Sequence, residues 1–195
     1  MAALAAIENL WKTRAAILFF AADDLPHMPY HAEFEQWIPA PLEKVFEFFG
    51  DPMKLPRIMP AWMRVEIEEI TIVAPRGFSS ARLAGEGTRF VASYRPLPFL
   101  PARIRSEAQI VGFGLNEFFT DAQSNGPFRS WHHRHEFAAE NREGISGTRV
   151  RDRIEYEVGY EPMGSVVNAL FIALQTRRTF VYRQRAVERL LVSTV

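Results

Sequence analysis

The part of the sequence best suited to chemistry is the stretch 131–137, WHHRHEF, which contains three of the five histidines in a chain of 195 residues. Its alternating pattern predicts a β-strand, in which successive side chains point to opposite faces of the sheet. His133 and His135 then share one face with Trp131 and Phe137. Because burying a polar group costs free energy unless it has a partner, two imidazole rings on an aromatic face indicate a binding or catalytic site.

The preceding strand brings a carboxylate to these histidines. If residues 124–130 form the turn between two antiparallel strands, Asp121 lies opposite His133. Two further pairs then share this face of the sheet: Phe119 with His135, and Gln123 with Trp131. A register error of two residues would keep the same side chains on this face.

The following strand brings a second carboxylate. If residues 145 and 147 bound the next turn, Asp152 lies near His135. The same register places Tyr156 near Trp131. A neighbouring carboxylate favours the charged form of an imidazole and selects its tautomer, so the histidine pair is predicted to be electrostatically coupled to an aspartate on each side.

Three kinds of site fit a histidine pair flanked by two carboxylates. The first is a polar network that satisfies its own hydrogen bonds and orients a ligand. The second is general acid–base catalysis by His133 and His135 with Asp121 and Asp152, in an enolisation, aldol cyclisation or dehydration. The third is a metal site, which is disfavoured because no histidine follows residue 135 to complete the ligand set. We expect ligand orientation, with no metal and no other cofactor.

Composition limits the class of protein. A hydrophobic content of 48% in 195 residues is typical of one folded domain with a substantial core. Basic and acidic residues balance at 23 each, so no net field attracts nucleic acid or an anionic membrane. The chain has no cysteine, which excludes disulfides and thiolate catalysis. It also has no hydrolase elbow, Walker motif or dinucleotide fingerprint. We expect a cytoplasmic protein that binds a small molecule.

The pattern of apolar and breaker residues predicts a mixed α and β architecture. Seven strands are expected at residues 31–38, 63–73, 88–94, 104–111, 116–123, 131–137 and 148–158, with a phase slip in the second strand near residues 68–69. Helices are expected at residues 42–49, 53–59 and 166–191. The arginines of the last helix are expected on its outer, solvated side: Arg177, Arg178, Arg183, Arg185 and Arg189.

Several of these segments resemble the START-like or SRPBCC superfamily, over about residues 29–191. The stretch 34–41, FEQWIPAP, looks like the opening strand and helix start of that superfamily. The stretch 119–123, FTDAQ, followed by Gly126-Pro127-Phe128 and the histidine strand, is similar to a bacterial branch of polyketide cyclase/dehydrase-like or ligand-binding proteins. The stretch 147–150, GTRV, with Asp152 continues this resemblance.

The resemblance implies an α+β helix-grip fold. In that fold a curved antiparallel sheet of about seven strands wraps around the long C-terminal helix, and two short helices follow the first strand. The apolar cavity between sheet and helix would bind a lipid, polyketide, sterol or other hydrophobic molecule. Beside the histidines and aspartates, the residues expected to contact the ligand are Phe119, Gln123, Trp131, Phe137, Tyr156, Phe99, Leu170 and Leu174.

Two other functions remain open at this stage. One is a polyketide cyclase or dehydratase that uses His133 and His135 as general acid and base. The other is a protein-interaction module, whose contact surface would be an apolar N-terminal helix and the Pro-rich loop at residues 95–101. That loop is also expected to fold over the mouth of the pocket.

Residues 1–27 are expected to form a helical extension that precedes a ligand-binding domain at residues 28–195. The apolar run at residues 15–22 is too short to span a bilayer. A signal peptide is disfavoured because Phe19 or Phe20 would stand where the cleavage site needs a small residue. Translation from Met28, without the extension, is the alternative.

Overall fold

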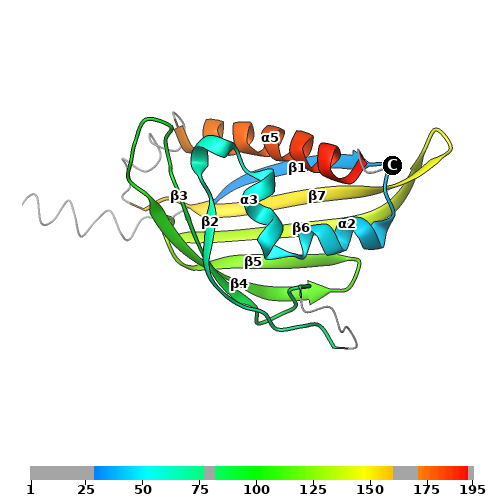
Figure 1. The fold of residues 1–195 in the computed structure, drawn as a ribbon, viewed down its shortest axis with the longest axis horizontal. Helices are drawn as coiled ribbons and strands as arrows, with labels where there is room; N and C mark the ends of the chain where they lie inside the picture. Colours follow the sequence, from blue (N-terminus) through cyan, green and yellow to red (C-terminus); the bar gives the residue numbers. More distant parts are fainter. Residues whose placement is uncertain (1–28, 77–81, 160–170, 193–195) are drawn as a thin grey trace, which may run out of the picture.

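An antiparallel sheet of seven strands forms the body of the computed structural model, which describes residues 29–76, 82–159 and 171–192 (Figure 1). The strands lie in the order β1-β7-β6-β5-β4-β3-β2, so the meander from β2 to β7 is extended at one edge by β1. The strands are β1 (Tyr30–Ile38), β2 (Glu66–Thr71), β3 (Arg89–Tyr94), β4 (Ile104–Gly114), β5 (Phe118–Asn125), β6 (Ser130–Arg142) and β7 (Ile145–Glu157). The helices are α2 (Leu42–Phe49), α3 (Leu55–Ile58) and α5 (Ala173–Val192), with short 3-10 turns at Pro52–Lys54 and Ala61–Met63.

The helices cover one face of the sheet, and α5 runs along β1 and β7 (Figure 1). Two hydrogen bonds hold α5 to β1. The side-chain amide of Gln36 donates to the carbonyl of Gln184 at 2.8 Å, and that of Gln184 donates to the carbonyl of Glu35 at 3.1 Å. The ring of Phe180 also stacks on that of Phe34, with centroids 4.4 Å apart. The sheet therefore grips its C-terminal helix, as the sequence predicted.

Strand alternation separates a charged outer face from an apolar inner face. On the outer face, Arg151 of β7 pairs with Glu33 and Glu35 of β1 at 3.3 and 2.9 Å. On the inner face, Phe46 of α2 is fully buried and meets the rings of three phenylalanines edge to face: Phe113, Phe119 and Phe137. One solvated and one packed face are typical of an antiparallel sheet, and the packed face here carries the core.

The expected strands are all present, and the predicted phase slip in the second strand is a bulge between Ile67 and Glu69. The turn between β6 and β7, however, lies at Glu143 and Gly144 rather than at residues 145–147. Both turn residues have positive φ, 51° and 81°, as a two-residue hairpin turn requires. Gly147 lies within β7 instead, where a Cβ atom would come within 2.6 Å of the Trp37 ring.

The helix predicted at residues 53–59 is divided into the 3-10 turn at Pro52–Lys54 and the short helix α3. The proline at residue 56 lacks the N–H that a continuous helix would need. Asp51 caps this segment, since its side chain accepts a hydrogen bond from the backbone N–H of Met53 at 3.0 Å. The predicted N-terminal extension, Leu170 and the start of the predicted last helix lie outside the described residues. In the part of the chain that the structure describes, no helix is long and apolar enough to cross a membrane.

Candidate functional site

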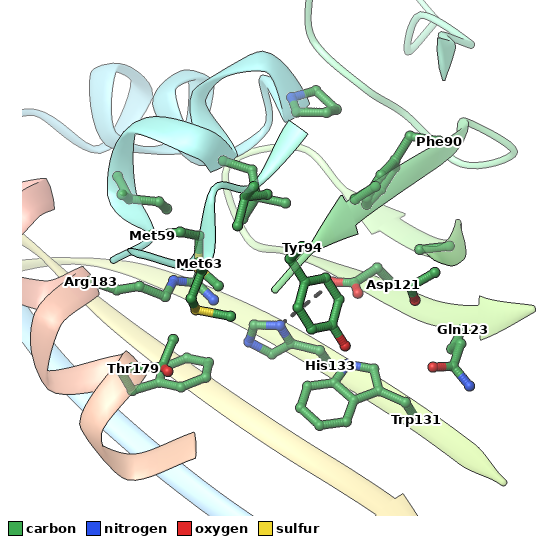
Figure 2. Close-up of a pocket in the computed structure, with 18 of the residues that line it drawn as sticks. Met59, Met63, Phe90, Tyr94, Asp121, Gln123, Trp131, His133, Thr179 and Arg183 are labelled. Atoms are coloured by element: carbon green, nitrogen blue, oxygen red, sulfur yellow. Dashed lines mark ion pairs between the residues drawn. The ribbon is translucent and has the colours of Figure 1, made fainter. Parts of the chain in front are cut away.

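A cavity of about 480 Å³ lies between the inner face of the sheet and the helices. Strands β3, β4, β5 and β6 form one wall, the segment from α2 to Met63 forms a second, and α5 forms a third. Most of this lining is apolar, with side chains such as Ile58, Phe90, Ile104 and Ile110. A group of polar side chains, among them Asp121, His133 and Arg183, lies where β5 and β6 face α5 (Figure 2).

The histidine pair of β6 forms the centre of this polar region. His133 and His135 are only 5% and 4% exposed, and their ring centroids lie 3.9 Å apart. Both rings line the cavity. Two imidazoles at this separation repel each other when both are charged, so their protonation is coupled.

Asp152 of β7 lies behind both rings. Its Oδ1 atom lies 3.1 Å from Nε2 of His133 and 2.6 Å from Nδ1 of His135. The contact to His133 is a hydrogen bond, whereas the short contact to His135 is not aligned as one. Asp152 is itself 7% exposed and does not line the cavity. This carboxylate therefore positions the two rings electrostatically, without contacting the cavity.

Asp121 of β5 lies on the cavity side of the same pair. Its Oδ2 atom lies 3.7 Å from Nδ1 of His133 and 3.7 Å from Nε2 of His135. Each imidazole ring therefore has one nitrogen directed at each aspartate. Since Asp121 lines the cavity, it is the carboxylate that a ligand would meet.

The predicted strand register is confirmed at the centre of the site. Asp121 pairs with His133, and His135 pairs with both Phe119 on one side and Asp152 on the other. The ladder between β5 and β6 stops one residue short of Gln123, whose amide instead donates to the carbonyl of Phe128 at 2.8 Å.

Burial and mutual charge shift the pKa of each group in the cluster. Burial alone would raise the pKa of Asp121 and Asp152, but the contacts and charges of the histidines outweigh it and hold both below their ordinary range. Burial and the charge of His135 lower the pKa of His133. Burial would also lower that of His135, but the charge of Asp152 and contacts with both carboxylates raise its pKa. His135 is therefore the more readily protonated member of the pair.

The predicted ligand-contacting residues divide into two groups. Six of the residues predicted at the site line the cavity: Phe119, Asp121, Gln123, Trp131, His133 and His135. Phe137 packs against Phe46 and Phe49 in the main core, and Tyr156 packs in a second cluster with Ile154 and Phe180. Phe137 and Tyr156 therefore belong to the packed core next to the cavity and do not line it.

Phe99 and Leu174 do not line the cavity. Phe99 is 80% exposed in the loop between β3 and β4, where only Pro96 of the Pro-rich segment reaches the cavity. Leu174 is 45% exposed because the cavity-facing side of α5 falls at other helical positions. The residues on that side follow a spacing of three or four: Ile172, Gln175, Thr176, Thr179, Phe180 and Arg183.

Arg183 is the principal site residue that sequence reasoning placed wrongly. It was predicted on the solvated side of the last helix, but it lines the cavity, and its guanidinium lies 4.6 Å from the centre of the Phe180 ring. Burial lowers the pKa of Arg183, while the charges of Asp152 and Asp121 oppose this shift. Arg183 lies one helical turn after Thr179, but nothing in the sequence alone showed that Thr179 faces inward.

Asp121, His133 and His135 could also hold a metal ion, because one ligand atom from each lies within 4.8 Å of the others. An ion bound at about 2.1 Å would hold any two ligands no more than about 4.2 Å apart. The side chains would therefore have to close around it. The positive charges on His135 and Arg183 also oppose a divalent cation at this place. The arrangement therefore favours a charged His135 between two carboxylates over a bound metal ion.

A curved antiparallel sheet that grips a long C-terminal helix across an apolar cavity defines the START-like, helix-grip class of proteins. Within this class, residues 38–179 match the family described as polyketide cyclase/dehydrase and lipid transport, and the chain belongs to that family. This description supports the binding of hydrophobic ligands at the level of the family. A comparison with curated proteins gave no match.

Solved structures share the fold at low sequence identity. The protein TTHA0849 from Thermus thermophilus is 19% identical with a TM-score of 0.59, over 85% of this chain and 100% of that one. A START superfamily protein from Mycobacterium smegmatis is 14% identical with a TM-score of 0.59, over 85% and 99%. A truncated norcoclaurine synthase from Thalictrum flavum is 13% identical with a TM-score of 0.60, over 88% and 99%.

Proposed function

We propose that this protein binds a hydrophobic or aromatic small molecule in its cavity, and that the histidine and aspartate cluster orients the polar group of the ligand. The observation that carries the proposal is a mostly apolar cavity of about 480 Å³ whose wall contains the cluster of Asp121, His133 and His135. Small-molecule sites of roughly 300–1,000 Å³ are commonly built in this way, with a few polar groups in an apolar wall.

The charges of the cluster support a binding role. The lowered pKa values of Asp121 and Asp152 favour their carboxylate forms, and the raised pKa of His135 favours its charged form beside them. These opposite charges attract one another inside a buried cluster. The cluster therefore offers an incoming polar group partners that are already in place.

A second candidate function is general acid–base catalysis on a polyketide-like substrate. The observation in its favour is that the pKa of His133 is lowered and that of His135 raised, which is how a base and an acid are prepared side by side. His133 would accept a proton from the carbon beside a carbonyl, and His135 would protonate a departing hydroxyl as water. Binding without turnover is favoured because both nitrogens of each ring already face a carboxylate.

Native mass spectrometry of the gently purified full chain, followed by extraction with organic solvent, tests the binding function. We expect a bound small molecule, and we expect Ala108→Trp to remove it, since Ala108 lines the cavity. Val111→Trp is the matched control, because Val111 lies on the same strand but is exposed. A wild-type protein that is empty and binds no hydrophobic probe would contradict the proposal.

Turnover separates the two candidates. The extracted molecule, or a polyketide-like probe, is incubated with wild-type protein and its mass is compared before and after. An unchanged molecule supports a carrier or sensor. Loss of one water per molecule, abolished by His133→Gln, would establish the acid–base enzyme instead.

A further inference from the structure

We propose that the ligand is a hydrophobic carboxylic acid, and that Arg183 and Thr179 of α5 bind its carboxylate inside the cavity. The inference rests on the proposed binding function and specifies the chemical class of the ligand. It concerns a wall of the cavity opposite the carboxylate of Asp121.

Arg183 presents unused hydrogen-bond donors to the cavity. Among the residues that the structure describes, its side chain makes no hydrogen bond and no ion pair. The guanidinium lies over the ring of Phe180, and the charges of Asp152 and Asp121 act on it from beyond ion-pair distance. That stacking holds the guanidinium in place while leaving its N–H groups free. A planar guanidinium matches a carboxylate through two parallel hydrogen bonds, so the missing partner has the shape of a carboxylate.

Arginines elsewhere in the sheet show what a satisfied guanidinium looks like in this protein. Arg105 contacts three glutamates at 3.2, 2.7 and 2.8 Å. Arg151 likewise contacts Glu33 and Glu35 at 3.3 and 2.9 Å. Arg183 lines the cavity, yet the carboxylates of Asp121 and Asp152 are directed at the histidines. The carboxylate that Arg183 lacks would therefore have to come with the ligand.

Thr179 supplies a second donor from the same wall. It lies one helical turn before Arg183, so both side chains project from the same side of α5. Thr179 is 8% exposed and lines the cavity. In the described part of the chain, its hydroxyl has no hydrogen-bond partner. Figure 2 shows Thr179 and Arg183 on one side of His133 and Asp121 on the other. A carboxylate on the α5 side would thus avoid the aspartate.

The test compares acids with their methyl esters, which share a skeleton but lack the negative charge. Medium-chain fatty acids and naphthoic acid, each with its ester, are titrated into the full chain by calorimetry and followed by native mass spectrometry. We expect at least one acid to bind more tightly than its ester. Arg183→Met should lower the affinity for that acid by about tenfold to a hundredfold, the range for a hydrogen bond to a charged group. The affinity for the ester should change by no more than about twofold.

Two further variants keep the test independent of folding. Arg178→Met is the matched control, because Arg178 lies on α5 but is exposed, and it should leave acid binding unchanged. Arg183→Lys keeps the positive charge but loses the planar guanidinium with its two parallel donors. It should therefore lower the affinity for the acid less than Arg183→Met does. Thermal melting of each variant confirms that it is folded.

The difference between acid and ester supplies a readout that a purely structural arginine would not affect, because loss of folding would weaken the binding of both. Esters that bind as tightly as their acids, or an unchanged acid affinity in Arg183→Met, would overturn the carboxylate site and leave the binding function standing. If no acid and no ester binds and the protein purifies empty, both proposals fail.

Discussion

His133 and His135 lie two residues apart on β6 with their ring centroids 3.9 Å apart, and both rings contact the same Oδ1 atom of Asp152. A carboxylate shared in this way can compensate one imidazolium more easily than two. The two rings consequently have pKa values displaced in opposite directions. The protein therefore contains a histidine pair that differs in charge, although both members lie on the same strand face.

The pH dependence of stability should reflect this asymmetry. The raised pKa of His135 gives stabilisation that is complete below the unfolded-state pKa of about 6.5 and is lost as the pH rises through the folded value. The lowered pKa of His133 destabilises the folded state as the pH falls below about 6.5. The free energy of unfolding, measured by urea denaturation across this range, should be greatest near pH 6.5.

Two variants check this assignment. His135→Gln should remove the decline of stability at alkaline pH, because the group that loses its proton is gone. His132→Gln, on the exposed face of the same strand, should leave the profile unchanged. A wild-type profile that keeps rising above pH 7 would contradict a raised pKa at His135.

The two carboxylates should respond differently to conversion into amides. Asp152→Asn leaves an imidazolium buried without its main partner, so it should lower the free energy of unfolding by about 3 kcal/mol. Asp121→Asn removes a more distant contact on the cavity side, so its loss should be smaller and its effect on ligand affinity larger. Urea denaturation and ligand titration of both variants measure the two effects. Equal losses of stability would show that Asp121 has the same structural role as Asp152.

The aromatic core beneath the cavity should depend strongly on Phe46. This ring is fully buried and meets three other phenylalanine rings edge to face. Phe46→Ala is expected to cost about 4 kcal/mol in the free energy of unfolding, through lost burial and the cavity left behind. Phe99→Ala is the control, since Phe99 is 80% exposed and its removal should change stability by less than about 0.5 kcal/mol. A comparable loss for both variants would contradict the assignment of the core.

Much of the site could be predicted from the sequence because it is built from adjacent antiparallel strands. The period of two selected His133 and His135, and the short turn before β6 placed Asp121 opposite His133. The pairing of His135 with Asp152 was also correct, although its turn was placed about two residues too late. The error affected only the bounds of the turn and not the strand pairing, so the predicted cluster is unchanged.

The residues that were misplaced depend on how distant elements pack. Arg183 lies on an amphipathic helix, and the width of the apolar stripe alone does not show whether an arginine at its edge faces the sheet or solvent. Gly147 was interpreted as a turn residue because glycine often marks a turn, but it is needed for the close approach of Trp37 from β1. Both outcomes depend on contacts between residues more than thirty positions apart, which local patterns do not contain.

The final prediction concerns the metal that the same cluster could hold. A divalent ion at Asp121, His133 and His135 would have to displace the proton on His135 and tolerate the nearby charge of Arg183. We therefore expect protein purified without chelator to carry far less than one equivalent of zinc, iron or manganese by elemental analysis. Added Zn²⁺ should change the melting temperature of wild type no more than that of the double variant His133→Ala, His135→Ala. One equivalent of metal retained by wild type and lost in that double variant would instead establish a metal centre, and the raised pKa of His135 would then describe the metal-free protein only.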